Sequence, residues 1–137
     1  MAILALNAGS SSLKFALFDG AEGAARWRGK VDLLRAELCI DGGGEPRQLA
    51  VVAPLGLDAA CGQVFAELVA RGEPPHAVVH RVVHGGDRFV APVRIDAALV
   101  QALAELTPLA PLHQPPSLAA LAAARAHFGP ARQFACF

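Results

Sequence analysis

Several features are scarce or absent in this chain of 137 residues, and each excludes a class of protein. Neither charge is in excess, because 12 basic side chains match 12 acidic ones, so we expect no nucleic-acid partner and no anionic membrane partner. Cysteine occurs three times and never as CxxC, which argues against a disulfide framework or a thiolate metal site and suits a reducing compartment. No apolar run approaches the roughly 18 residues that a membrane span requires. We therefore expect a cytoplasmic protein.

Charged residues are also few, at 18% of the chain, whereas hydrophobic residues make up 54%. This composition excludes an intrinsically disordered chain, and the length predicts one folded domain. Lysine is rare in this chain, which has two lysines, Lys14 and Lys30, and ten arginines. A lysine inside a motif is therefore informative.

The first part of the chain has the pattern of a strand-rich structure. Two short apolar segments around a Gly/Ser loop predict a hairpin, and further segments separated by turn residues predict additional strands. The expected strands span 1–7, 13–18, 26–33, 35–40 and 48–52, with a glycine-rich turn at 41–44.

The apolar period then changes to that of helices separated by strands. We expect a first helix with Asp58 as its cap, Gly72 as its stop, and Val64, Phe65, Leu68 and Val69 on its apolar face. The later elements are a strand over 77–83 that is buried on both faces, a helix capped by Asp96, a helix over 117–128 opened by Ser117 and closed by 129–130, and a strand over 133–137. A hairpin followed by βαβ units predicts an α/β fold with a mixed sheet.

The first candidate site is the hairpin loop and its second strand, NAGSSSLKF at 7–15. Gly9 permits a positive φ, and the amides and hydroxyls that follow it can surround an anion. Strand alternation places Ser12, Lys14 and Ala16 on one face, so Lys14 can reach a phosphate from that face. The segment is not a Walker A loop, because GxxxxGK[ST] is absent and a strand follows. The alternative is a plain hairpin tip with an exposed lysine.

The second candidate site is HRVVHGGD at 80–87, where the predicted parallel strand ends. Ligands of α/β sheets gather at the carboxyl ends of parallel strands, and a guanidinium such as that of Arg81 suits a carboxylate or a phosphoryl group. The alternative is a structural pair between Arg81 and Asp87 beside a core histidine, His80, since an unpaired buried arginine is costly.

The third candidate is His113, within LAPLHQPP at 109–116. Three prolines restrain this loop just before the expected helix. The alternative is an ordinary surface histidine.

Taken together, NAGSSSLKF, HRVVHGG and APLH before a proline-containing segment resemble the acetate/propionate/butyrate kinase family of the actin-like ATPase superfamily, in the family's order and at about its spacing. The resemblance implies an actin-like ATPase (ribonuclease H-like) α/β domain, a mixed sheet with flanking helices. It also implies a carboxylate phosphotransferase that interconverts acetate and ATP with acetyl phosphate and ADP, with Mg²⁺ (or Mn²⁺) as cofactor.

On the nucleotide side, the resemblance implies that Asn7 lies near the metal ion. It places Ser10, Ser12 and Lys14 near the phosphates of ATP.

On the carboxylate side, the resemblance implies that Arg81 holds the acetate carboxylate or the phosphoryl group in transit. Val83 and Leu112 are expected to line the pocket for the acetate methyl group, and His113 to hydrogen-bond the phosphoryl oxygens. In-line transfer of this kind needs alignment and hydrogen-bond donors more than covalent catalysis.

The sequence departs from the family pattern at three places. Gln114 follows His113 where the family usually has Asn, and Asp87 stands where it commonly has Glu. The chain ends at Phe137, where family members continue into DTAFH. We therefore expect residues 1–137 to be an N-terminal domain that ends before a second, nucleotide-binding domain, inactive in isolation and part of a homodimer in the full-length enzyme.

Two alternatives to an acetate kinase remain at this point. One is a propionate or butyrate kinase, because Val83 and Leu112 do not decide between acetate and these longer carboxylates. The other is a non-catalytic actin-like binding or assembly module.

Overall fold

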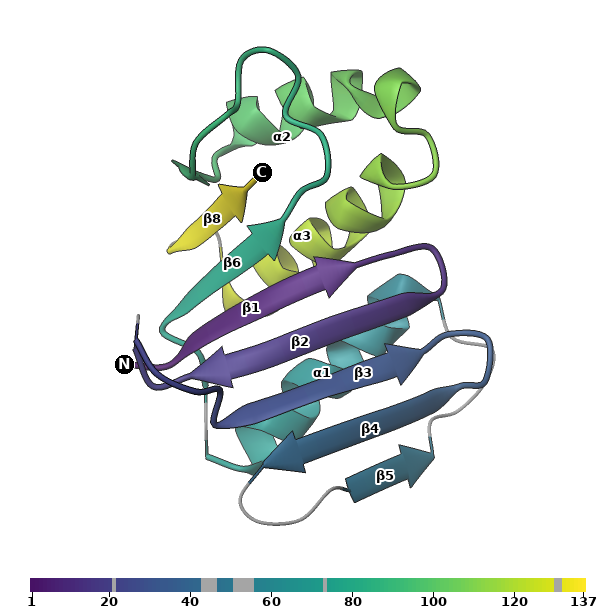
Figure 1. The fold of residues 1–137 in the computed structure, drawn as a ribbon, viewed down its shortest axis with the longest axis vertical. Coiled ribbons are helices and arrows are strands. Elements are labelled where there is room, and N and C mark those ends of the chain that lie inside the picture. Colours follow the sequence, from purple (N-terminus) through teal and green to yellow (C-terminus); the bar gives the residue numbers. More distant parts are fainter. Residues whose placement is uncertain (21, 43–46, 51–55, 73, 130–131) are drawn as a thin grey trace.

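The computed structural model describes residues 1–20, 22–42, 47–50, 56–72, 74–129 and 132–137. These residues form one sheet and three α-helices (Figure 1). Its strands are β1 (Ile3–Ala8), β2 (Ser12–Phe18), β3 (Trp27–Asp32), β4 (Glu37–Gly42), β5 (Arg47–Ala50), β6 (Ala77–Arg81), β7 (Val93–Arg94) and β8 (Gln133–Cys136). Its helices are α1 (Leu57–Ala70), α2 (Ala97–Glu105) and α3 (Gln114–Phe128), with a short 3-10 helix, η1 (Thr107–Leu109).

The sheet is mixed, as predicted. In the described residues its eight strands lie in the order β5-β4-β3-β2-β1-β6-β8-β7. The first five strands form an antiparallel meander that includes the predicted β1–β2 hairpin. Both β6 and β8 run parallel to β1, so these three strands end at the same edge of the sheet.

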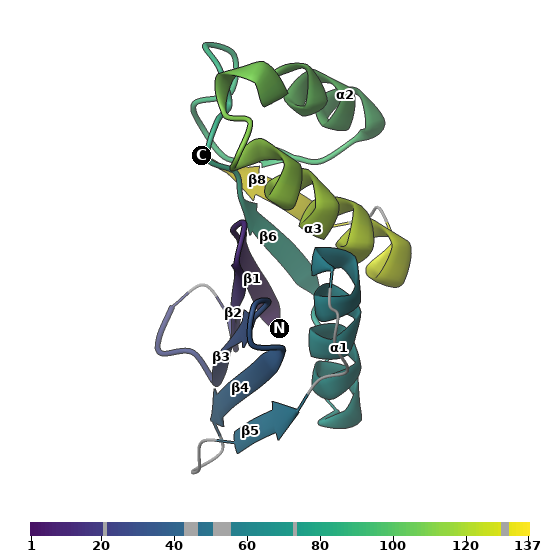
Figure 2. The same ribbon diagram turned by 90° about the vertical axis from the view of Figure 1, so that its right-hand side faces the viewer.

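The two faces of the sheet differ, because α1 and α3 both lie on one of them (Figure 2). Alternate side chains of the strands, such as Leu4, Leu13 and Leu38, are fully buried against helix residues that include Phe65 and Leu68. Burying one such side chain stabilises the fold by roughly 1.5–3 kcal/mol. The opposite face is not covered by any described helix, and the intervening side chains of β1 to β4 lie on it.

Three of the expected element details are wrong, each for a physical reason. The first helix begins at Leu57 with Gly56 at its cap, so Asp58 lies in the first turn, where a carboxylate favours the positive end of the helix dipole. Its Val69 is 49% exposed and does not belong to the buried face. The third helix begins at Gln114 instead of Ser117, because prolines are tolerated in a first turn, where the amides lack helical partners anyway.

The other helix signals are confirmed. The Asp96 carboxylate accepts a hydrogen bond from the Leu99 amide at 2.7 Å, which caps α2. Gly72 and Gly129 follow α1 and α3 with φ of +72° and +82°, the left-handed region that favours glycine at helix ends. The expected turn residues 43–44, strand residues 51–52 and the predicted helix stop at 130 lie outside the described residues.

The parallel strand is shorter and less buried than predicted. β6 ends at Arg81, and only its helix-facing residues, Val78 and His80, are fully buried. Arg81 is exposed because it lies on the face of the sheet that no described helix covers, and Val83, which follows the end of β6, is exposed as well.

Candidate functional site

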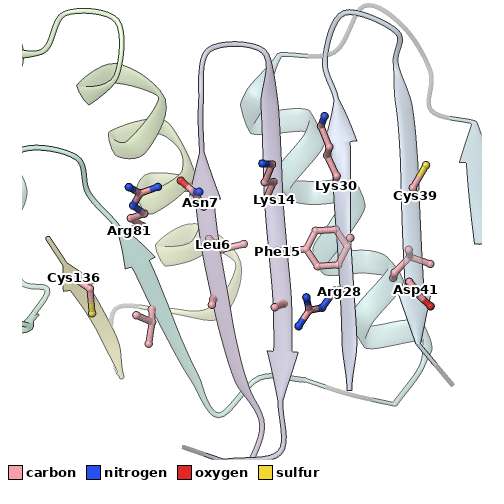
Figure 3. Close-up of a pocket in the computed structure, with 15 residues that line it drawn as sticks. Leu6, Asn7, Lys14, Phe15, Arg28, Lys30, Cys39, Asp41, Arg81 and Cys136 are labelled. Atoms are coloured by element: carbon pink, nitrogen blue, oxygen red, sulfur yellow. The ribbon is translucent and has the colours of Figure 1, made fainter. Parts of the chain in front are cut away.

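The helix-free face of the sheet is hollowed by a cavity of about 620 Å³, which spans β1 to β4, β6 and β8 (Figure 3). Its lining contains three residues that the sequence singled out, Asn7, Lys14 and Arg81. The remaining lining residues are Ala5, Leu6, Phe15, Ala16, Arg28, Gly29, Lys30, Cys39, Ile40, Asp41, Val79 and Cys136. The cavity therefore lies at the edge where β1 and β6 end.

One row of side chains crosses this cavity. In the strand register Asn7 is the partner of Lys14, Lys14 of Lys30, and Lys30 of Cys39. The β1–β6 register pairs Leu6 with His80, so the next residues, Asn7 and Arg81, follow side by side. Figure 3 shows Arg81, Asn7, Lys14 and Lys30 at a similar height across the sheet.

The cavity is cationic, although the chain as a whole is neutral. Its lining includes four cations (Lys14, Arg28, Lys30 and Arg81) and one carboxylate, that of Asp41. Asp41 is the register partner of Arg28. Within the described part of the chain, none of the four cations makes a hydrogen bond or an ion pair. Such a surface is suited to hold an anion.

The hairpin loop is built differently from the prediction. Gly9 does not adopt a positive φ; its amide donates to the Ser12 carbonyl oxygen at 2.8 Å and closes a tight turn. A second bond, from the Leu33 amide to the Ser11 carbonyl at 3.0 Å, ties the loop to the end of β3. The predicted alternation is confirmed, because Leu13 and Phe15 are buried and Lys14 is exposed on the cavity face.

Ser10 lies in the turn between β1 and β2, and Ser12 begins β2; neither residue lines the cavity. Ser10 is exposed. The structure therefore does not place Ser10 and Ser12 in the cavity beside Lys14.

Arg81 is not the structural residue that the alternative proposed. It is exposed, and among the described residues no ion pair joins it to Asp87. The core role of His80 is confirmed, since this residue is 2% exposed and its Nε2 lies 3.0 Å from Oε1 of Gln133.

Val83, Leu112 and His113 do not line the cavity. All three are exposed, and Leu112 and His113 lie in the connection between η1 and α3. The structure thus brings Asn7, Lys14 and Arg81 together but leaves these three apart from them.

Gln114, the departure from the family pattern, is fully buried. Its Nε2 donates to the carbonyl oxygens of His84 at 3.2 Å and of Leu103 at 2.9 Å. This side chain therefore joins the loop after β6 to the start of α3, so the second and third motifs are connected through it.

No metal site is complete among the described residues, because no group of three or more His, Cys, Asp or Glu side chains could hold an ion there. Asn7 offers one amide oxygen in the cavity lining. Mg²⁺ is usually bound by one or two protein oxygens together with water and substrate phosphates, so Asn7 fits as one such ligand. Separately, no described helix is long and apolar enough to cross a membrane.

Sequence reasoning missed Arg28, Lys30, Asp41 and the two cavity cysteines, Cys39 and Cys136. A signal for the first two was available. Arg28 and Lys30 are two residues apart in a predicted strand, so they share one face.

The model of the acetokinase family matches residues 2–137. The chain is similar to the acetate kinase of Deinococcus deserti, with 41% identity over 141 residues that cover 100% of this chain and 35% of the relative. It is also similar to the acetate kinase of Deinococcus radiodurans, with 40% identity over 130 residues that cover 91% of this chain and 32% of the relative. The chain thus spans about a third of the length of these relatives.

Solved structures resemble the fold over 99% of the chain. They include the acetate kinase of Porphyromonas gingivalis, with 30% identity, a TM-score of 0.88 and 37% of that chain covered. They also include a propionate kinase from Francisella tularensis, with 26% identity, a TM-score of 0.90 and 36% of that chain covered. The predicted actin-like ATPase fold is confirmed by these matches.

Proposed function

The chain belongs to the acetokinase family, and we propose that it supplies the phosphate- and carboxylate-binding side of an ATP:acetate phosphotransferase. The observation that carries the proposal is the row of Asn7, Lys14 and Arg81 across one cavity at the carboxyl ends of β1 and β6. An amide oxygen and two cations without described partners provide what a metal-bound phosphate chain and a small carboxylate require.

In this reaction a carboxylate oxygen of acetate attacks the γ-phosphorus of ATP. The bond from that phosphorus to the bridging oxygen breaks, and the electron pair leaves with ADP. Lys14 neutralises charge on the phosphates, with Ser10 and Ser12 as donors at the loop. Arg81 holds the carboxylate in line or stabilises the equatorial oxygens, a contribution typical of charge-stabilising groups in phosphoryl transfer.

Asn7 would be one protein ligand of Mg²⁺ or Mn²⁺, which would supply positive charge to offset that of the phosphates. His113 is proposed as a donor to the phosphoryl oxygens, and Val83 and Leu112 as the apolar wall for the methyl group. Their exposure leaves all three side chains free to meet a substrate that lies above the sheet.

We also propose that residues 1–137 are the N-terminal domain of a longer, homodimeric enzyme whose remaining part binds the nucleoside. The chain's coverage of about a third of its relatives supports this division.

A chimera tests the proposed function. This chain would replace the matching segment of the Deinococcus deserti acetate kinase, to which it is 41% identical. Acetyl phosphate is trapped as the hydroxamate, with the unaltered relative as the reference. We expect turnover with acetate; a folded chimera that binds ATP but turns over no short carboxylate would favour a non-catalytic module instead.

A propionate kinase is the second candidate, favoured by the TM-score of 0.90 to the Francisella tularensis enzyme. The same chimera assayed with acetate, propionate and butyrate decides between them. If kcat/KM is higher for propionate than for acetate, propionate is the substrate and the proposal changes accordingly.

A further inference from the structure

The chain's two lysines are direct partners across β2 and β3. Lys14 and Lys30 pair in the antiparallel register, both are exposed, and both line the cavity (Figure 3). Side chains in such a pair have Cβ atoms about 4.5–5.5 Å apart, and like charges placed in this way destabilise a sheet. Nothing in the predicted role of Lys14 accounts for a second lysine at this position.

The strand register gives Lys30 and Arg28 partners of different charge. Arg28 has Asp41 as its register partner, whereas the partners of Lys30 are a cation and the thiol of Cys39. Three carboxylates lie near Lys30 in the register. Asp41 and Glu37 each lie diagonally on β4, two residues from Cys39. The third is Asp32, two residues along β3, whose carboxylate already accepts hydrogen bonds from the amides of Leu34 and Arg35 at 3.0 Å each.

Asp32 does feel the charge of Lys30, because that ammonium is one of the groups that lower the pKa of its carboxyl, after the backbone hydrogen bond from Arg35. The carboxylate is nevertheless engaged by its turn, and no ion pair with Lys30 forms in the described structure. Neither lysine of the Lys14–Lys30 pair therefore has an ion-pair partner among the described residues.

We propose that Lys30 is a second phosphate-binding lysine and that Lys14 and Lys30 together hold one phosphate group of a di- or triphosphate chain. A phosphate oxygen pair can accept hydrogen bonds from both ammonium groups at once, and its negative charge offsets their mutual repulsion. This inference rests on the proposed function, because it extends the phosphate site of Lys14 to a neighbour that the family pattern did not indicate.

The lysine content of the chain makes the test direct. A sample labelled with ¹³C only in lysine gives two sets of side-chain Cε–Hε signals, one for Lys14 and one for Lys30. The chain is titrated with pyrophosphate at one ionic strength, held constant with added salt, so that the screening of surface charges is the same at every point. We expect both sets to shift along curves that give one dissociation constant.

Variants then measure the contribution of Lys30. Lys30→Gln should weaken pyrophosphate binding at least fivefold, and Lys30→Arg should restore most of the loss, since it keeps the charge. Arg35→Gln is the matched control, because Arg35 is exposed at the β3–β4 turn and does not line the cavity; its affinity should stay within twofold of the parent chain. The thermal midpoint of Lys30→Gln without anion should be unchanged or higher, which separates lost binding from lost folding.

The outcomes are distinguishable. A Lys14 signal that titrates while the Lys30 signal stays fixed, or a Lys30→Gln affinity equal to that of Arg35→Gln, overturns the role of Lys30 and leaves the proposed function intact. Two fixed signals overturn the phosphate site itself and count against the proposed function as well.

Discussion

His80 and Gln133 connect the neighbouring parallel strands β6 and β8. His80 Nε2 donates to Oε1 of Gln133 at 3.0 Å, and Nε2 of Gln133 donates to the Gly129 carbonyl oxygen at 2.6 Å. Nδ1 of His80 has no hydrogen-bond partner among the described residues. The pair thus locks the end of α3 to β6, the strand that carries Arg81.

This pair predicts a pH-dependent stability. Burial lowers the pKa of His80 from 6.5 to about 4, against a smaller opposing effect of the Gln133 hydrogen bond. The unfolded chain binds a proton at His80 more readily than the folded chain does. The contribution of neutral, buried His80 to the free energy of unfolding is therefore complete above pH 6.5 and is lost as the pH falls toward 4. The free energy of unfolding should fall by up to roughly 3 kcal/mol through this pH range.

Urea unfolding of the parent chain and of His80→Asn at pH 7, 5.5 and 4 measures this effect. The variant is expected to be less stable at pH 7 but to lose less stability on acidification. Equal slopes in the two proteins would show that His80 is not the responsible group.

Gly29 predicts a steric limit beneath the lysine pair. A Cβ atom at this position would lie within 2.4 Å of the Cys39 carbonyl oxygen and 2.5 Å of Cζ of Phe15. Gly29→Ala should therefore destabilise the chain by about 1–3 kcal/mol, the usual cost of overpacking. Gly62→Ala is the control, because Gly62 is exposed in α1 with nothing within 4 Å, and this change should stabilise by about 0.5–1 kcal/mol. Thermal or urea unfolding measures both, and a neutral Gly29→Ala would contradict the close contact.

Arg81 should matter more for catalysis than its neighbour His84. The His84 ring accepts a hydrogen bond from the Gly86 amide at 3.0 Å, which holds the turn, whereas Arg81 lines the cavity. In the chimera, Arg81→Ala should lower kcat/KM for acetate by about 10²–10³, the scale of a lost transition-state donor. His84→Ala should reduce stability more than activity, and equal losses in kcat/KM would show that Arg81 contributes no more to catalysis than His84 does.

The isolated chain should bind nucleotides weakly and without preference for the base. The described cavity offers cations for phosphates on an open face, where water screens each charge pair. We expect millimolar or weaker binding of ATP, with GTP and pyrophosphate within about threefold of it. Titration calorimetry checks this, and micromolar binding selective for adenine would contradict it.

The same chain should show no measurable acetate kinase activity. It spans about a third of its relatives, and each missing transition-state donor typically costs about 10²–10³ in rate. A hydroxamate assay on the purified chain measures this, and a turnover rate within tenfold of that of a full-length relative would refute the prediction.

Strand positions were predictable because the alternation of apolar and polar residues and the residue types of turns can both be read from a short stretch of sequence. The faces of β2 followed from residue spacing alone, and the register then placed Lys14 in the cavity. Helix starts were less predictable, since a proline pair such as Pro115–Pro116 reads equally as a loop or as a first turn. The backbone shows that α3 begins at Gln114, with both prolines in its first turn.

The full width of the cationic surface could not be predicted, because it depends on register between strands. Nothing in the sequence near residue 30 says that Lys14 lies opposite it. Likewise, the exposure of Arg81 depends on which face of the sheet the helices cover, which is a property of the whole chain.

The concentration of cations on the helix-free face has a consequence for how ligands arrive. Four positive side chains and one carboxylate line the cavity, while the chain as a whole is neutral, so the rest of the surface carries a compensating negative excess. The cavity is therefore a local positive pole on a chain of zero net charge. An approaching polyanion is turned toward that pole before contact, so its association rate should fall steeply as salt is added, while uncharged molecules are not steered at all.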